Sequence, residues 1–352
     1  LTLSRLRGRV RVGALQKVRA KLLHTNPMKP QIRAKAEELG FLACGFAAAA
    51  PSQSRDKLEA WLGNGFHAGM EWMNRADAVE KRADVRKLFP GAQTVVIVAM
   101  NYRTDAPFDE AQNGKIARYA RGFDYHDFIK ERLRELLAFV QSLAPCEGKI
   151  CVDSTPILER EWAVRAGLGW IGKNTLLLSR EFGSYVLLGE LLLDLEIEPD
   201  APHVAQFCGS CTRCLDACPT NAFVAPRVLD ANKCISYHTI ENKKLAPKTL
   251  REGFGDWVFG CDVCQEVCPW NGKAARDEVF SSEPQLWTRP EMPTLEEWPQ
   301  IEQSEFSRRL KGSPIKRTKR RGMKRNAARV LKNRREKSEK NAQSLEKDVN
   351  DG

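Results

Sequence analysis

The sequence has no apolar run long enough to cross a bilayer. A membrane-spanning helix needs about 18 or more consecutive apolar residues, and the longest candidate, Val186 to Leu195, is interrupted by Glu190 and Asp194. No Walker nucleotide-binding pattern is present. With 42% hydrophobic residues over 352 positions, the composition is typical of a globular protein of two or three compact units. We therefore expect a soluble chain that does not associate with a membrane.

Acidic residues are absent from positions 1–27, and positions 308–340 are also strongly basic, so the net charge of +11 comes mainly from the two ends. A basic balance favours a polyanionic partner, with nucleic acid ahead of a membrane surface, although simple solvated charge is the alternative. We expect residues 1–27 to be a basic extension outside the fold, with the working protein starting near Met28. A transit peptide is the alternative for this Arg-rich, acid-free segment.

Eight of the eleven cysteines fall between positions 208 and 268. The first run has the spacing C-x2-C-x2-C-x3-C-P, which bacterial ferredoxins use to hold [4Fe–4S] clusters. The run from Cys261 to Pro269 repeats its tail with one ligand missing, and Cys234 can supply that ligand. The predicted ligand sets are Cys208, Cys211, Cys214 and Cys268 for cluster one, and Cys218, Cys234, Cys261 and Cys264 for cluster two.

Zinc binding and disulfide bonding fit these cysteines less well. Zinc also accepts C-x2-C pairs, but two consecutive x2 gaps followed by x3 and proline are poor zinc-ribbon spacing. Structural disulfides are disfavoured because nothing in the sequence indicates a secreted chain. The remaining Cys44, Cys146 and Cys151 have no partner motif, so we interpret them as free thiols of the core without assigned chemistry.

Upstream of the cysteines, strands and helices alternate. Hydrophobic spacing predicts helices over 31–39, 56–62 and 129–143, a helical stretch ending near 166, and strands over 94–100, 149–153 and 185–195. This order indicates an α/β or α+β layer beside the cluster module, and we assign the fold class α+β. The expected units are a catalytic domain, a two-cluster ferredoxin-like domain, a short basic helical segment and a disordered tail, at 28–200, 201–280, 281–335 and 336–352.

Asp153 ends one of these apolar strands. A carboxylate there often faces a pocket, where burial raises its pKa and lets it act as an acid, although a helix-capping or turn aspartate is the more frequent case. The glycine-rich turn 167–172 is only a weak indication of a phosphate-bearing ligand. The segment 118–126 gathers Arg, Tyr, Asp and His, which suits a polar ligand or a surface turn equally well.

Several blocks, taken together, strongly resemble the epoxyqueuosine reductase family. They occur in that family's order, and the resemblance covers about residues 28–335. The blocks are 118–126 (RYARGFDYH), 152–160 (VDSTPILER), 167–174 (GLGWIGKN), the ferredoxin-like run from Cys208, CISY from Cys234 and GCDVC from Gly260.

The resemblance implies a catalytic domain that holds a base-off cobalamin and is related in fold to the cobalamin domain of reductive dehalogenases. It implies a two-electron, two-proton deoxygenation of the epoxide in epoxyqueuosine at the tRNA wobble position, giving queuosine. Asp153 matches the family's proton donor by its place in the motif. The His-on signature D-x-H-x-x-G is absent, since Ile129 stands where its last glycine would be. The predicted cobalamin contacts are Tyr119, His126, Lys173, Asn174, Ser236 and Asp262.

An anticodon stem-loop as substrate calls for basic side chains on its phosphates. The predicted tRNA contacts are Lys243, Lys244, Arg317, Lys319, Arg320, Lys324 and Arg325. The resemblance further implies a low-potential electron donor such as a small flavoprotein, and we expect a cytoplasmic monomer. Two alternative functions remain open. One is a dehalogenase-like cobalamin and iron–sulfur reductase of a small molecule, and the other is a non-catalytic electron-transfer protein.

Overall fold

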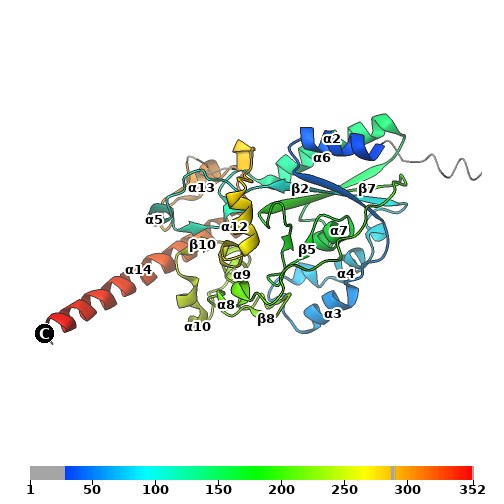
Figure 1. Cartoon of the computed structure of the whole chain (residues 1–352). Helices are drawn as coiled ribbons and strands as arrows, with labels where there is room; N and C mark the ends of the chain where they lie inside the picture. Colours follow the sequence, from blue (N-terminus) through cyan, green and yellow to red (C-terminus); the bar gives the residue numbers. More distant parts are fainter. Residues whose placement is uncertain (1–27, 287–288, 290, 351–352) are drawn as a thin grey trace, which may run out of the picture.

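A central sheet of four strands organises the first half of the protein. The computed structural model describes residues 28–286, 289 and 291–350, so the predicted basic extension 1–27 lies outside the described residues (Figure 1). The sheet has the order β1-β2-β7-β4. Its strands are β1 (Ala43–Ala48), β2 (Thr94–Asn101), β7 (Val186–Leu193) and β4 (Gly148–Cys151).

Every pairing in this sheet is antiparallel. The α+β class is therefore confirmed, and the α/β description of the catalytic domain is wrong. An alternation of strands and helices along the sequence predicts layers, but it does not fix the direction in which neighbouring strands run. All eight residues of β2 are buried, as expected for a continuous apolar run at the centre of a sheet covered on both faces.

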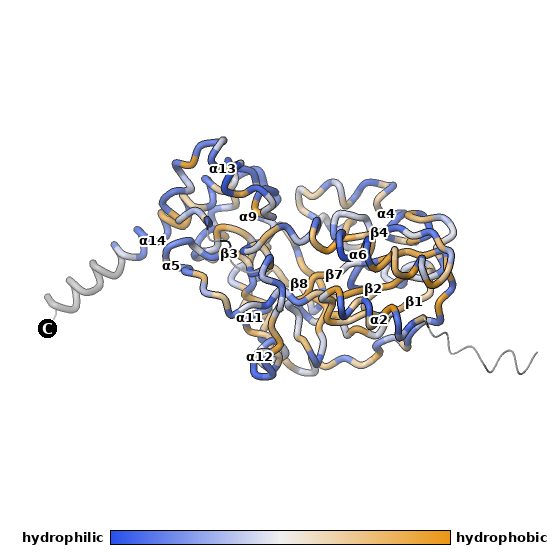
Figure 2. Tube along the Cα trace, turned by 90° about the horizontal axis from the view of Figure 1, so that it is seen from above, coloured by the Kyte–Doolittle hydropathy of each residue, from blue (hydrophilic) through white to orange (hydrophobic). Residues whose placement is uncertain are grey.

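Helices cover both faces of the sheet (Figure 1). Helices α2 (Met28–Glu38) and α6 (Tyr125–Leu143) pack on one face, where Ile32 and Leu133 join the core. Helix α7 (Glu159–Arg165) packs on the other face through Trp162, on the side where α3 (Arg55–Gly63) and α4 (Ala76–Ala83) also lie. Figure 2 shows the hydrophobic residues concentrated along β1, β2 and β7. The structure confirms the type of the elements predicted from hydrophobic periodicity. These are the helices 31–39, 56–62 and 129–143 and the strands 94–100 and 185–195.

The cysteine-rich region follows as short elements joined by turns. They are α8 (Arg213–Asp216), β8 (Phe223–Ala225), β9 (Val228–Leu229), α9 (Ile235–Ile240), α10 (Lys248–Arg251), β10 (Trp257–Phe259), α11 (Val263–Glu266) and α12 (Pro269–Arg276), whereas the paired strands β5 (Trp170–Ile171) and β6 (Leu177–Leu178) precede β7 in the chain.

A segment of the first half belongs structurally to the second. Strand β3 (Lys115–Ile116), which follows the short helix α5 (Glu110–Asn113), pairs in parallel with β10. Ile116 is buried in one hydrophobic core with Phe259 and Trp298. The boundary expected near residue 200 therefore does not separate two independent units, because this segment crosses it. It carries the 118–126 motif to the cysteine-rich region.

The C-terminal part ends in one long helix. Helix α13 (Gln303–Arg309) and a 3-10 turn (Pro314–Thr318) lead into α14 (Lys319–Asn350), which packs on β10 through Met323, Ala327 and Val330 and then extends from the body (Figure 1). The disordered tail predicted from position 336 is corrected, because the helix continues to Asn350. Residues 336–350 contain no Gly or Pro and are rich in helix-forming Glu, Lys, Ala and Gln. Among the described helices, none combines the length and apolar character that a membrane span requires.

Candidate active site and cluster-binding cysteines

Asp153 lies just beyond the end of β4, on a turn that exposes its carboxyl group. Its backbone has φ +44°, a left-handed conformation that non-glycine residues seldom adopt. The side chain is 56% exposed. Its backbone N–H donates a 2.8 Å hydrogen bond to Oε1 of Glu159, the first residue of α7. The Glu159 carboxyl group therefore stabilises the turn through its backbone, while the Asp153 side chain faces outward.

His126 connects two aspartates. It stands in the first turn of α6, where Asp124 caps the helix by accepting the His126 backbone N–H. Its Nδ1 lies 2.7 Å from Oδ1 of Asp124, and its Nε2 lies 2.8 Å from Oδ2 of Asp153. The imidazole is thus oriented on both sides, and its second nitrogen points at the carboxyl group of the predicted proton donor.

The proton of this pair resides on the histidine. Burial alone would lower the pKa of His126, but hydrogen bonds to Asp124 and Asp153 outweigh burial and raise the pKa to about 9. Burial raises the pKa of Asp153, yet the hydrogen bond and positive charge of His126 hold it below the ordinary value for an aspartate. The raised pKa that burial alone would give is therefore not found. Burial is the largest single influence on Asp153, but the hydrogen bond and charge of His126, together with Tyr125 and Arg317, outweigh it.

Two tyrosines and an arginine complete the surroundings. The Tyr125 ring stacks on the His126 ring at 4.2 Å, and Tyr119 meets Tyr125 edge-on at 6.0 Å. Tyr125 also hydrogen bonds to Asp153. Arg317 pairs with Glu241 at 2.8 Å, and its positive charge favours the ionised form of Asp153. Of the predicted cobalamin contacts, the structure thus brings Tyr119 and His126 close to Asp153.

Cysteines of the second half lie near partners assigned to them, while the two ligand sets stay a prediction. Burial, together with the nearby Cys268, Cys208 and Cys211, raises the pKa of Cys214 to about 11. The thiol of Cys261 is likewise affected by Cys234 and Cys218, and that of Cys264 by Cys261 and Cys234. A cavity of about 170 Å³ lies among the thiols of the first set. Cysteines from well-separated parts of the sequence are therefore brought to common centres.

These thiols do not converge on a single point. In the part of the chain that the structure describes, no group of three or more His, Cys, Asp or Glu side chains is arranged around one metal ion. A tetrahedral zinc site needs four ligand atoms about 2.3 Å from a single ion. The choice of a cluster over zinc therefore rests on the spacing of the cysteines in the sequence.

The other predicted cobalamin contacts lie against the cluster-binding loops. Lys173 Nζ donates to the carbonyl oxygens of Gly209 and Cys211, at 2.8 and 2.9 Å. Asn174 Nδ2 donates to the Cys264 carbonyl oxygen at 3.3 Å, and Ser236 hydrogen bonds to the Cys234 thiol. These three residues therefore support the loops that carry the cluster ligands, and their contact with cobalamin stays a prediction.

Asp262 links the cluster loop to the 118–126 segment. It is 1% exposed, and its Oδ2 accepts the Arg118 backbone N–H at 2.7 Å. Burial raises its pKa to about 6. Because it lies between Cys261 and Cys264, Asp262 fixes the cluster loop against the segment that carries Tyr119. This is a connecting role that its sequence position did not reveal.

The predicted tRNA contacts divide into exposed and internally bonded side chains. Lys243, Lys244 and Lys319 are exposed. Arg325 instead donates to the carbonyl oxygens of Asn242, Lys244 and His238, so its guanidinium group holds the loop that presents the two lysines. The remaining candidates are Arg317, which pairs with Glu241, Arg320, which donates to the Ile301 carbonyl oxygen at 3.2 Å, and the partly buried Lys324.

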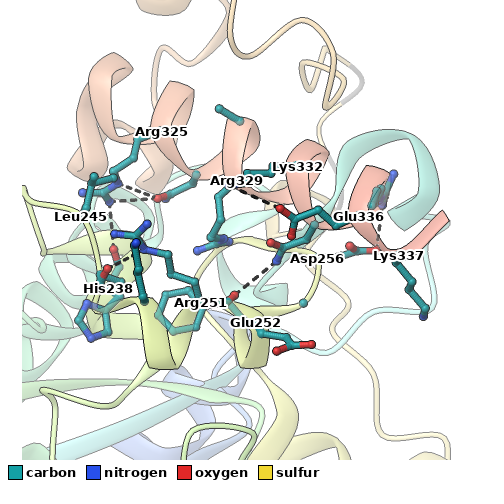
Figure 3. Close-up of a pocket in the computed structure, with 18 of the residues that line it drawn as sticks. His238, Leu245, Arg251, Glu252, Asp256, Arg325, Arg329, Lys332, Glu336 and Lys337 are labelled. Atoms are coloured by element: carbon teal, nitrogen blue, oxygen red, sulfur yellow. Dashed lines mark hydrogen bonds and ion pairs between the residues drawn. The ribbon is translucent and has the colours of Figure 1, made fainter. Parts of the chain in front are cut away.

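A basic groove runs between α14 and the loop around α10 (Figure 3). It encloses about 1450 Å³ and is lined by eight Lys or Arg side chains and three carboxylates. Figure 3 shows Arg325, Arg329 and Lys332 extending from α14, with Arg251 facing them. Burial and the neighbouring arginines lower the pKa of Arg329 to about 10, because cations crowd this wall. We call this the α14 groove.

Sequence reasoning missed two carboxyl groups near Asp153. Glu159 accepts the Asp153 backbone N–H, and Glu190 of β7 is fully buried. The only sequence signal for Glu190 is that a charged residue interrupts an otherwise apolar strand.

Comparison with known proteins identifies the family. Residues 82–154 match a family model described as epoxyqueuosine reductase QueG, and residues 207–271 match a 4Fe-4S double cluster binding domain. The epoxyqueuosine reductase of Cyclobacterium marinum is 42% identical over 300 residues, which cover 84% of this chain and 94% of that relative. The chain belongs to the epoxyqueuosine reductase family. A family member from Gloeobacter violaceus is 40% identical over 87% of this chain and 96% of its own length.

Solved structures of epoxyqueuosine reductases share the fold. One is a complex with an epoxyqueuosine-modified tRNA-Tyr stem loop, and it superposes with a TM-score of 0.79 at 34% identity over 86% of this chain and 80% of its own. A structure of the Bacillus subtilis enzyme has a TM-score of 0.77 at 34% identity, covers 86% of this chain and 81% of its own, and has its catalytic aspartate loop swung out of the active site. The double cluster domain of the family coincides with the two cysteine sets.

Proposed function

We propose that the protein reduces epoxyqueuosine to queuosine at the wobble position of tRNA, with two [4Fe–4S] clusters and a base-off cobalamin as cofactors. Membership of the family supports the reaction, and the double cluster domain supports the clusters. The carrying observation is that the 118–126 segment places His126 on the carboxyl group of Asp153 while Asp262 ties the same segment to a cluster-binding loop. A proton donor and an electron source thus meet at one junction.

The side chains present fit these cofactors. Each cysteine set supplies four thiols, the number that a [4Fe–4S] cluster needs. At the junction, His126 has both ring nitrogens bonded to carboxylates, so it is not free to ligate cobalt. That arrangement fits a cobalamin bound without a protein histidine.

The chemistry divides between cofactors and protein. The bound clusters and cobalamin would supply two electrons to break the epoxide C–O bonds, and the product side gains a C=C bond and one water. The protein supplies protons and orientation. The proton held on His126, whose Nε2 is 2.8 Å from Asp153 Oδ2, passes to the Asp153 carboxyl group and from there to the leaving oxygen, so that His126 becomes neutral as Asp153 delivers the proton. Tyr125 fixes the imidazole by stacking.

A tRNA partner fits the basic surfaces. Lys243, Lys244 and Lys319 are exposed. The α14 groove adds further cations nearby, because Arg325 lines the groove and also donates a hydrogen bond to the Lys244 carbonyl oxygen. Phosphate contacts give affinity without sequence specificity. Clusters sensitive to oxygen and a tRNA substrate fit an activity in the cytoplasm, with electrons from a low-potential donor.

An anaerobic assay tests this function. The cluster-reconstituted protein is given cobalamin, a chemical reductant and epoxyqueuosine-containing tRNA, and nucleosides are read by mass spectrometry. Loss of one oxygen mass is expected. Asp153→Asn should lower product formation at least about 100-fold while iron and cobalamin contents stay unchanged, since only the proton donor is removed. An intact epoxide with verified cofactors would overturn the proposal and favour a small-molecule reductase.

A further inference from the structure

The turn that carries Asp153 is held in an unfavourable backbone conformation. Asp153 has φ +44°, where a glycine is normally preferred, and its N–H donates to Glu159 Oε1 at 2.8 Å. In the Bacillus subtilis relative, the corresponding loop can leave the active site. The hydrogen bond from the Asp153 N–H to Glu159 therefore helps to keep the Asp153 carboxyl group in its position for proton transfer.

Glu190 lies beneath this contact. It pairs with Cys151 of β4, two residues before Asp153, and with Ile97 of β2. Residues paired across antiparallel strands point to the same face, so Glu190 faces the side of the sheet covered by α7, whose first residue is Glu159. Its side chain is 0% exposed, and neither carboxyl oxygen has a hydrogen-bond partner among the described residues.

No cation compensates a charge at this place among the described residues. The titratable groups that face Glu190 are Cys151, Glu159 and Asp153. Arg165 of α7 lies over the Trp162 ring, but its charge goes to Glu161 at 3.6 Å. An ionised, unpaired carboxylate in such a site is strongly disfavoured. Glu190 therefore carries a proton.

Glu159 and Glu190 are electrostatically coupled. Burial raises the pKa of Glu159 to about 7, and burial together with Glu159 and Asp153 raises that of Glu190 well above its ordinary value. Like charges close to each other oppose ionisation of both groups. A protonated Glu190 therefore leaves Glu159 able to carry the charge that accepts the Asp153 N–H.

We propose that Glu159 is a positioning residue for Asp153, and that the protonated Glu190 behind it allows Glu159 to keep this role. Glu159 holds the Asp153 turn in its left-handed conformation with the carboxyl group turned toward His126. Ionisation of Glu190 would place two negative charges behind the turn and release it. This role rests on the proposed function, because it matters to the reaction through Asp153 as proton donor.

The first measurement is infrared spectroscopy at pH 8, which detects the C=O stretch of protonated carboxyl groups. Wild-type protein should show a band that Glu190→Gln lacks, while the exposed-surface control Glu135→Gln keeps it. Identical bands in all three proteins would overturn the protonated state of Glu190 and with it this part of the proposal. No substrate or cobalamin is needed, so this result is independent of whether epoxide reduction is observed.

The second measurement is hydrogen exchange of the peptide covering residues 152–158, with turnover measured in parallel. In Glu159→Leu, one amide should exchange at least tenfold faster, and kcat should fall at least tenfold at unchanged KM. Glu159→Gln, whose side-chain oxygen still accepts the N–H, should retain slow exchange and most of kcat. Wild-type exchange in Glu159→Leu, or fast exchange in Glu159→Gln, would contradict the positioning role. Iron content of each variant verifies the fold. The two proposals can fail separately. If Glu159→Leu shows faster exchange but the wild-type protein does not reduce the epoxide, the positioning role stands and only the proposed function is contradicted.

Discussion

His126 should make the stability of the protein depend on pH in a definite direction. Its pKa is raised to about 9 by Asp124 and Asp153, whereas an unfolded histidine titrates near 6.5. The folded protein therefore binds the proton more tightly. The stabilisation is fully present below about pH 6.5, falls as the pH rises, and is lost above about pH 9. Replacement by Gln removes the titrating group and with it this dependence.

The magnitude follows from the shift. Each pKa unit corresponds to about 1.4 kcal/mol, so a shift of about 2.5 units gives about 3 kcal/mol. The His126 side chain is only 26% exposed, so solvent screens its interaction with the two aspartates weakly and most of this energy is retained. For a chain of 352 residues, an unfolding entropy of about 2.1 cal/mol/K per residue converts about 3 kcal/mol into a change of about 4 °C in Tm.

The assay is thermal unfolding of the cluster-loaded protein under anaerobic conditions from pH 6 to 9.5. Because cysteines and lysines also titrate in this range, the informative quantity is the difference in Tm between wild type and His126→Gln. That difference should be largest at pH 6 and shrink by about 4 °C toward pH 9.5. Arg134→Gln, on the exposed side of the same helix, removes a cation that does not titrate and should show no such trend. A constant difference between wild type and His126→Gln would refute the ion-pair reasoning.

Three further variants probe the clusters, the groove and the sheet. Cys234→Ala should lower iron content toward half by destabilising one of two clusters, and an unchanged iron count would contradict the ligand assignment. In the α14 groove, Lys332→Ala and Lys248→Ala should each reduce the salt slope of stem-loop binding by about 0.9, measured by titration at several salt concentrations, and an unaltered slope would exclude them as phosphate contacts. Gly45→Ala would press a Cβ against the backbone oxygen of Ala166 and should lower the free energy of unfolding, measured by chemical denaturation, by about 1–3 kcal/mol. Gly63→Ala, which has open space around it, is the control, and equal stability of the two variants would contradict the steric argument.

The features that the sequence predicted well are those with short-range patterns. Strand β2 and helix α6 follow from hydrophobic periodicity, and the first cysteine run follows from a spacing that few other sites share. The assignment of Cys234 and Cys268 to different clusters rests on the ferredoxin-like spacing and stays a prediction. In the fold, Cys234 lies near Cys218, and Cys268 lies near Cys208 and Cys211, which agrees with it.

The features that the sequence did not reveal depend on contacts between distant segments. The parallel pairing of β3 with β10 joins positions about 140 residues apart, and two-residue strands have no detectable period. The net pKa direction at Asp153 depends on His126, 27 positions earlier, whose orientation only the fold determines. Helix α14 was predicted too short because polar composition was interpreted as disorder, although Lys332 and Glu336 already form an i,i+4 pair where the tail was expected to begin.

Two carboxyl groups on opposite sides of one turn illustrate how the fold sets proton affinity. Asp153 faces His126 and has a lowered pKa, whereas Glu159, bonded to the same residue's backbone, faces the apolar side of the sheet and has a raised one. A single hydrogen bond, from the Asp153 backbone N–H to the Glu159 carboxyl group, connects the two residues, and they are only six positions apart in the sequence. Their positions in the sequence therefore do not explain why their pKa values shift in opposite directions. The difference comes from what covers each side: a cation at the surface, and a neutral acid, Glu190, in the core.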